Sequence, residues 1–187
     1  MEAFLVSLST VAIAEMGDRT QLLALLLAAK FRKPVPIVAA ILVATLANHA
    51  LAGFVGVWIG KYLTPQVLDI VVGISMLGMA AWTLIPDKLD SDDAKTGGHG
   101  PFIATLVAFF IAEMGDKTQI ATAALAAGYS NLFAVVAGTT LGMLVANVPV
   151  VFMGSKFAKR LPMNLIHKGA SALFAVLGVY FIVRGMI

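Results

Sequence analysis

The sequence predicts an all-α integral membrane protein whose six transmembrane helices form two three-helix repeats of inverted topology. Only 12% of the 187 residues are charged, and 60% are hydrophobic. A soluble domain of this length carries about 25% charged residues, because its surface must be wet. The polar residues lie between long apolar runs, and one nine-residue segment occurs twice along the chain. These observations exclude an ordinary soluble globule and indicate a duplicated membrane protein.

Six apolar runs account for most of the chain. A helix needs about 20 residues to cross the roughly 30 Å of hydrocarbon in a bilayer. Prolines stand at or near the breaks between the runs, where a missing N–H costs least, and Pro149 within the fifth run predicts a kink. The predicted spans cover residues 4–29, 35–60, 66–85, 102–127, 131–155 and 165–184.

The duplication lies in the first and fourth runs. Residues 13–21 match residues 111–119 at every position except one, where Arg19 is replaced by Lys117. The following runs agree more weakly, with Asn48 and Asn147 at equivalent points. The unit is therefore three spans, repeated as 1–85 and 101–187 around a linker at 86–100. Because three is odd, the second copy enters the bilayer from the opposite side.

The N-terminal run is expected to be mature structure and not a cleaved signal peptide. It carries Glu2 and no basic segment, and its Ile-Ala-Glu sequence recurs deep inside the chain. Loop charges predict the orientation. With both termini outside the cytoplasm, nine Lys and Arg residues lie in inner segments and two in outer ones, which satisfies the positive-inside rule. The inner residues are Lys30, Arg32, Lys33, Lys88, Lys95, Lys156, Lys159, Arg160 and Lys168, and the outer ones are Lys61 and Arg184. The 86–100 linker is then cytoplasmic.

Four carboxylates fall within the predicted spans. Glu15 and Asp18 are three residues apart, so on a helix they share a face about 4.5 Å apart along the axis. Glu113 and Asp116 repeat this spacing in the inverted copy. Acids at membrane depth are costly on a lipid-facing surface. The sequence therefore predicts that all four meet between the repeats, where they suit a hard divalent cation.

Neighbouring residues supply further candidate ligands and countercharges. Gly17 and Gly115 weaken the helix locally, which would let backbone carbonyls turn toward an ion. Arg19 and Lys117 follow Glu15 and Glu113 by four residues, so each is expected to pair within its own helix and leave the ionised site with a net charge of −2. Metal binding that displaces protons from carboxylates would couple the ion to proton movement. Further candidate oxygen ligands are Gln21, Asn48, Gln119 and Asn147, and Thr20 and Thr118 are expected to support the site with nearby hydroxyl oxygens.

Each of these residues also has a purely structural interpretation. The acids and bases could be ion pairs that pin helices together, and the two asparagines could be interhelical hydrogen-bond partners. Met16 and Met114 are either soft ligands or packing residues, with packing favoured. His49 is either a proton relay or a hydrogen-bonded structural residue, with the structural role favoured. The linker's Asp87, Asp90, Asp92, Asp93 and His99 suit a solvated loop better than a cation sensor.

Two Gly-x-x-x-Gly pairs complete the candidate features. Gly56 with Gly60, and Gly138 with Gly142, allow close approach of helices. They either pack the repeats together or form a homodimer interface.

The duplicated segment resembles the signature of a known family. That family comprises bacterial manganese exporters and eukaryotic Golgi cation/proton exchangers, and it is defined by two E-x-G-D-[KR]-[ST] motifs. Residues 15–20 and 113–118 match it in full, and the six-span layout extends the resemblance over the whole chain. The resemblance implies Mn²⁺ efflux from the cytoplasm in exchange for protons, with the motif acids as ligands. The chain resembles the bacterial members in having no long N-terminal targeting extension, and this resemblance implies that the protein lies in a bacterial plasma membrane.

Other functions fit parts of the same sequence pattern. A Ca²⁺/H⁺ antiporter would use the same oxygen ligands. A passive channel could use the acids as a filter, and a membrane-embedded metal-dependent hydrolase would need an additional nucleophile or metal-held water, for which the sequence offers no second constellation. The chain contains no cysteine, so thiolate chemistry is excluded. The expected partners are a divalent ion, protons and lipid, with no resident cofactor and no nucleic acid.

Overall fold

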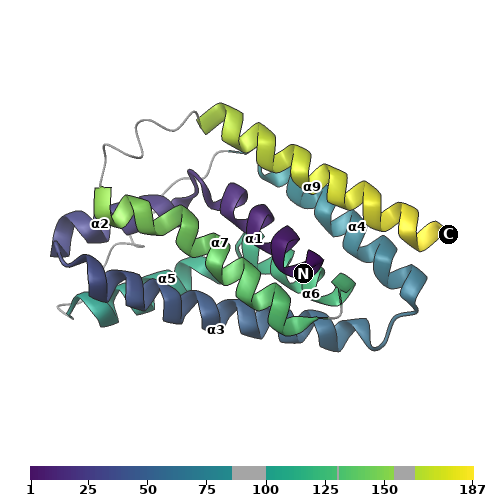
Figure 1. Cartoon of the computed structure of the whole chain (residues 1–187), viewed down its shortest axis with the longest axis horizontal. Coiled ribbons are helices and arrows are strands. Elements are labelled where there is room, and N and C mark those ends of the chain that lie inside the picture. Colours follow the sequence, from purple (N-terminus) through teal and green to yellow (C-terminus); the bar gives the residue numbers. More distant parts are fainter. Residues whose placement is uncertain (86–99, 130, 154–162) are drawn as a thin grey trace.

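The computed structural model describes residues 1–85, 100–129, 131–153 and 163–187, and the secondary-structure elements in these segments are all α-helices. Figure 1 shows the helices as a bundle of long, roughly antiparallel rods. In chain order they are α1 (Glu2–Glu15), α2 (Arg19–Phe31), α3 (Pro34–Gly60), α4 (Pro65–Trp82), α5 (Pro101–Glu113), α6 (Lys117–Tyr129), α7 (Leu132–Met153) and α9 (Met163–Met186).

The prediction of one continuous helix for the first and fourth spans is wrong. Each of these spans is two shorter helices, α1 with α2 and α5 with α6, separated by a Met-Gly-Asp segment. The other four predicted spans are single helices long and apolar enough to cross a membrane, namely α3, α4, α7 and residues 165–186 of α9. Proline begins α3, α4 and α5, as expected from its missing N–H. Pro149 lies inside α7, and the linker residues 86–99 lie outside the described segments.

Equivalent helices of the two halves run in opposite directions. In Figure 1 the chain starts a little to the right of the centre and runs leftward through α1, whereas α5 and α6 run from left to right. The α3–α4 connection and the C-terminus also lie on the right, and the α2–α3 connection lies on the left. Both termini are therefore on the same side of the bundle.

The principal helix contacts join one half of the chain to the other. α1 packs along α7, α3 along α5 and α6, and α4 along α9. Glycine makes these approaches close: a Cβ on Gly56 would lie 2.0 Å from the carbonyl oxygen of Ala123 in α6, and one on Gly142 would lie 2.6 Å from that of Leu8 in α1. Of the two roles considered for the glycine pairs, these contacts support packing of the repeats.

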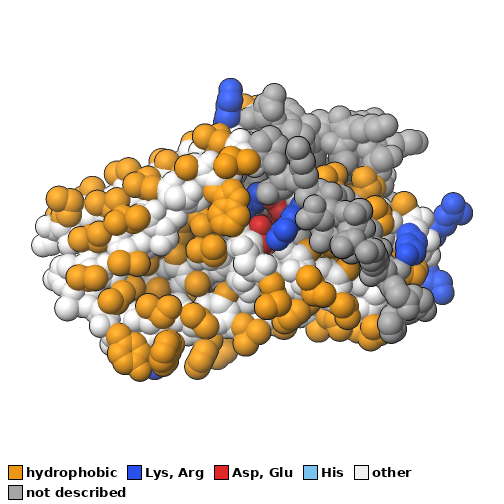
Figure 2. Space-filling view, turned by 180° about the vertical axis from the view of Figure 1, so that it is seen from behind, with side chains coloured by type: hydrophobic (Ala, Val, Ile, Leu, Met, Phe, Trp, Pro, Cys, Tyr) orange, Lys and Arg blue, Asp and Glu red, His pale blue; other side chains and the backbone are white. Residues whose placement is uncertain are grey.

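Apolar side chains cover the outside of the bundle and polar ones collect inside it. Figure 2 shows one face with many hydrophobic side chains, a small central area in which acidic and basic side chains lie together, and further Lys and Arg side chains at the edges. Large aromatic residues such as Phe54, Trp58 and Phe133 are exposed, whereas the motif acids are buried. A lipid-facing surface with a polar interior is the arrangement that a bilayer requires.

Candidate metal centre

Two identical helix breaks build the centre. Glu15 is the last residue of α1 and Arg19 the first of α2, and Glu113 and Lys117 occupy the same places in α5 and α6. The middle residue of each break is a glycine with positive φ, 85° at Gly17 and 76° at Gly115. The left-handed region costs other residues about 1–2 kcal/mol, so glycine is what allows the chain to turn here. The sequence-based expectation that these glycines weaken the helix is confirmed.

A glutamine closes each break. The Gly17 N–H donates to Gln21 Oε1 at 2.9 Å, and the Gly115 N–H donates to Gln119 Oε1 at 2.7 Å. Gln21 also donates from Nε2 to the Ala146 carbonyl of α7 at 2.8 Å. Both amide oxygens, expected as metal ligands, therefore have a structural role, because they satisfy a backbone donor that the broken helix exposes.

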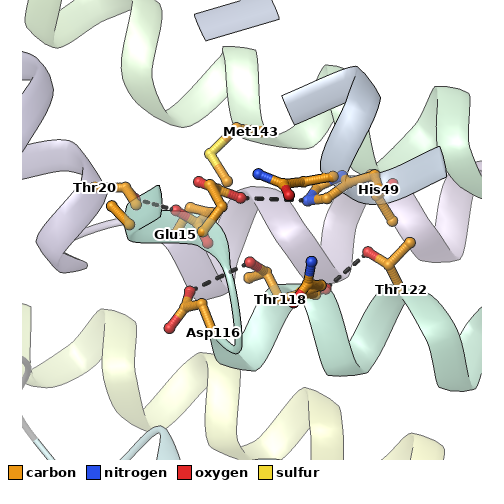
Figure 3. Close-up of polar contacts among 12 residues, drawn as sticks. Glu15, Thr20, His49, Asp116, Thr118, Thr122 and Met143 are labelled. Atoms are coloured by element: carbon orange, nitrogen blue, oxygen red, sulfur yellow. Dashed lines mark hydrogen bonds and ion pairs between the residues drawn. The ribbon is translucent and has the colours of Figure 1, made fainter. Parts of the chain in front are cut away.

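The carboxylates lie at the breaks and are buried from solvent. Oxygens of Glu15, Asp18 and Asp116 lie within 4.8 Å of one another, close enough for one ion to bridge them. Figure 3 shows Glu15 and Asp116 converging from the two breaks. Thr20 donates its hydroxyl to Glu15 Oε2 at 2.5 Å, and Thr118 donates to Asp116 Oδ2 at 3.4 Å. The two threonines thus orient acids of their own motif.

Glu113 lies beside this group of three and not inside it. Its Oε2 is 3.6 Å from His49 Nε2, and both side chains are fully buried. Glu113 still interacts electrostatically with Asp116 and with Glu15. The structure therefore brings three of the four predicted acids into one cluster and places the fourth at its edge, next to a histidine.

The expected pairing of each base with the glutamate of its own helix is wrong. The helix ends between the two residues, so the i,i+4 geometry does not exist. Instead the ion pairs cross between motifs: Lys117 Nζ pairs with Asp18, and Arg19 Nη2 lies 3.8 Å from Asp116 Oδ1. Arg19 also donates to the Ala112 carbonyl at the end of α5. Each half supplies the countercharge for the other.

Each of the two asparagines donates through Nδ2 and has an amide oxygen without a donor among the described residues. Asn48 Nδ2 donates to the Phe110 carbonyl at 3.1 Å, and Asn147 Nδ2 donates to the Met143 carbonyl at 3.1 Å. Both side chains are buried, yet neither Oδ1 accepts a hydrogen bond from the described part of the chain. The same is true of Glu15 Oε1 and of both Glu113 carboxylate oxygens. Buried acceptors without donors are unusual, and here they are of the type that a hard cation prefers.

A cavity reaches one wall of the centre. It has a volume of about 380 Å³ and lies between α3, α5 and α6. Asn48 and Gln119 line it together with apolar side chains that include Phe110 and Met114. Met114 is largely exposed, which argues against ligation of an ion at the buried centre by this residue.

Comparison with known proteins shows the family of this chain. The model of the divalent cation/proton antiporter GDT1 family matches residues 3–91 and 101–186. The chain belongs to the GDT1 family. Its match in two segments agrees with the duplication of the chain, and the GDT1 family is one of transporters and not of enzymes. The hydrolase alternative is therefore set aside.

Two relatives of this GDT1 family member carry names that describe cation transport. A Vibrio cholerae protein named "Putative manganese exporter" is 53% identical over 96% of this chain and 90% of its own length. The Saccharomyces cerevisiae divalent cation/proton antiporter GDT1 is 25% identical over 97% of this chain and 84% of its own. A rice GDT1-like protein 3 is 28% identical, covering 92% and 71% respectively. No solved structure gives a significant match.

Proposed function

We propose that this protein exports Mn²⁺ from the bacterial cytoplasm in exchange for protons. The observation that carries the proposal is the cluster of Glu15, Asp18 and Asp116, whose oxygens lie within 4.8 Å in the interior of a bundle with an apolar exterior. The names of the V. cholerae and yeast relatives support manganese as the ion and protons as the counter-ion.

We assign the ligands from the buried acceptors. Glu15, Asp18 and Asp116 hold the ion. Glu113, at the edge of the cluster, supplies the fourth negative charge of the site. Asn48 and Asn147 contribute the amide oxygens that are otherwise without donors among the described residues. Gln21, Gln119, Gly17 and Gly115 shape the two breaks, and Thr20 and Thr118 orient the acids.

Charge balance gives the coupling its physical basis. With Arg19 and Lys117 protonated and all four acids ionised, the centre carries two negative charges, which one divalent ion neutralises. When the ion leaves, two uncompensated negative charges in a buried site are unfavourable, and protonation of carboxylates relieves them. Alternating occupation by Mn²⁺ and by protons is therefore the expected cycle.

The architecture proposed for this cycle has six membrane crossings in two inverted repeats, 1–85 and 101–187, with α1–α2 and α5–α6 as the two broken spans. Broken helices at the midplane and repeats of opposite direction are typical of secondary transporters that rock around a central site. Positive loop charge supports a location in the plasma membrane with both termini outside the cytoplasm.

Flux through the reconstituted full-length protein tests the proposal. In proteoliposomes with an imposed pH gradient, the rate of Mn²⁺ transport should depend on the gradient and saturate with Mn²⁺ concentration. The pH of the lumen should change as Mn²⁺ crosses, because protons move in the opposite direction. Comparing Mn²⁺ with Ca²⁺ under the same gradient decides between the manganese exporter and the Ca²⁺/H⁺ antiporter. Flux that is linear in metal and indifferent to the gradient would indicate a channel and contradict the proposal.

A further inference from the structure

The helices α3 and α7, which carry Asn48 and Asn147, form two walls of the acidic centre, and the two walls differ in chemistry. Aligning Asn48 of α3 with Asn147 of α7 places Ala44 opposite Met143 and His49 opposite Val148. Ala44 and Met143 are both fully buried. The α7 wall therefore carries a thioether at a point where the α3 wall has only a methyl group.

Contacts on either side of Met143 place it at the level of the first helix break. On one side, Gly142 meets the α1 backbone near Ala12, where an added Cβ would lie 2.9 Å from the amide nitrogen. On the other, the Ala146 carbonyl accepts the hydrogen bond from Gln21 in α2. The break that contains Glu15 and Asp18 lies between these two contacts. Figure 3 draws Met143 in the same close-up as Glu15 and Asp116.

The sulfur is in a polar environment, unlike that of a packing methionine. Met143 Sδ accepts a hydrogen bond from Asn147 Nδ2 at 2.9 Å. The buried Met76 and Met79 of α4 belong to an apolar cluster, whereas Met143 belongs to neither of the apolar clusters formed by the described residues. A thioether sulfur has a second lone pair, so one amide N–H can hold the side chain while leaving the sulfur able to bind a metal. Asn147 Oδ1, which accepts no hydrogen bond from the described residues, lies on the same amide group.

We propose that Met143 Sδ is a ligand of the transported ion and makes the site prefer Mn²⁺ to Ca²⁺ and Mg²⁺. This inference rests on the proposed function and names the residue that determines its selectivity. Oxygen ligands alone accept all three ions. A soft thioether adds affinity for a transition metal and little for Ca²⁺ or Mg²⁺, because ligand softness separates these two groups of ions.

Paired flux measurements test the selectivity. Met143→Leu removes the sulfur and keeps the side chain apolar and of similar size. In proteoliposomes of the full-length protein, the ratio of Mn²⁺ to Ca²⁺ uptake should fall by about fivefold or more, mainly through loss of Mn²⁺ uptake. Met114→Leu, next to Glu113 but largely exposed, is the matched control and should keep the wild-type ratio. An unchanged ratio in Met143→Leu, or an equal fall in both ions, overturns the inference. Wild-type protein that moves neither ion contradicts the proposed function itself.

Equilibrium binding gives a readout that does not depend on transport. The chain has no cysteine, so a sulfur atom bound to a metal in this protein belongs to a methionine. X-ray absorption of the protein loaded with Cd²⁺, a softer probe ion, should show a sulfur neighbour in the wild type and in Met114→Leu, and only oxygen or nitrogen neighbours in Met143→Leu. A shell without sulfur in the wild type, or sulfur that persists in Met143→Leu, overturns the assignment.

Discussion

Lys117 of the second motif forms its ion pair with Asp18 of the first, and both side chains are almost completely buried. Its counterpart pair, Arg19 with Asp116, crosses in the other direction but leaves the guanidinium 27% exposed. Because each half neutralises an acid of the other, the centre is assembled only when the two halves are packed together.

The buried pair should therefore be the more important of the two for stability. Lys117→Met leaves Asp18 buried beside an apolar side chain, and removing one partner of a buried pair costs about 3–5 kcal/mol. Arg19→Met should cost less, about 1 kcal/mol, because the pair is longer and reaches solvent. Thermal denaturation in detergent, followed by size-exclusion chromatography, measures both.

The double variant Asp18→Asn with Lys117→Met provides the control for this comparison. It removes both charges, so it should recover part of the stability lost in Lys117→Met alone. If Lys117→Met is no less stable than Arg19→Met, the pair does not hold the halves together as described.

The glutamates should be needed for transport and not for folding. Glu15→Gln and Glu113→Gln keep the size of the side chain, and Glu15→Gln also keeps an oxygen that can accept from Thr20, but each removes one negative charge from the site. Mn²⁺ flux should drop at least about tenfold in each variant, because carboxylate charge sets cation affinity. Glu2→Gln, an exposed acid at the start of α1, is the control and should transport normally. Wild-type flux in either motif variant would remove that glutamate from the site.

The sequence predicted the composition of the centre better than its geometry. The duplicated acids were recognisable because carboxylates within apolar runs are costly, and three of the four do meet. The ion pairs were assigned wrongly because i,i+4 reasoning assumes a continuous helix, and glycine alone does not say whether a helix bends or ends. The positive φ at Gly17 and Gly115 is seen only in the structure, where the side chain of the glutamine four residues later accepts a hydrogen bond from each glycine N–H.

Other features had no usable signal in a single sequence. Met143 looks like any apolar residue of a helix, and its contact with Asn147 and its level beside α1 are seen only in the structure. The glutamines are chemically suited to metal, and the backbone donors that occupy them appear only once the break exists. The four long apolar helices, by contrast, followed from hydropathy alone, because the bilayer sets both the length and the polarity of a crossing helix.

The helix break at Gly115 should be sensitive to a single methyl group. A Cβ there would meet nothing within 4 Å, so Gly115→Ala tests the backbone conformation without a steric clash. Its φ of 76° should make the substitution destabilising by about 1–2 kcal/mol. Gly78→Ala in α4 is matched, since a Cβ there is also free of contacts and the residue is helical. It should be neutral or stabilising by up to about 1 kcal/mol. Equal melting temperatures for the two variants would argue against a strained break.

The Gly56-x-x-x-Gly60 pair should tolerate alanine at one end only. At Gly56 the added Cβ would lie 2.0 Å from the Ala123 carbonyl oxygen in α6, whereas at Gly60 its nearest neighbour is a Leu68 methyl at 3.4 Å. Gly56→Ala should force α3 away from α6, which carries Lys117 and the second motif, and so reduce both folded yield and Mn²⁺ flux. Gly60→Ala should behave like the wild type in both assays. The opposite order of severity would mean that these helices do not pack as closely as the structure shows.

Asn48 provides the sharpest separation between ligation and helix packing. Its Nδ2 donates to the Phe110 carbonyl, while its Oδ1 has no donor among the described residues. Asn48→Asp keeps an oxygen for the metal but removes the donor, and Asn48→Leu removes both. If the oxygen binds the ion, the aspartate variant should keep substantial Mn²⁺ binding and the leucine variant should lose it by about tenfold. If the residue only joins α3 to α5, both variants should keep the wild-type affinity for Mn²⁺ and lose about 1 kcal/mol of stability with the hydrogen bond. Isothermal titration of purified protein with Mn²⁺, alongside melting curves of the same preparations, distinguishes the two outcomes.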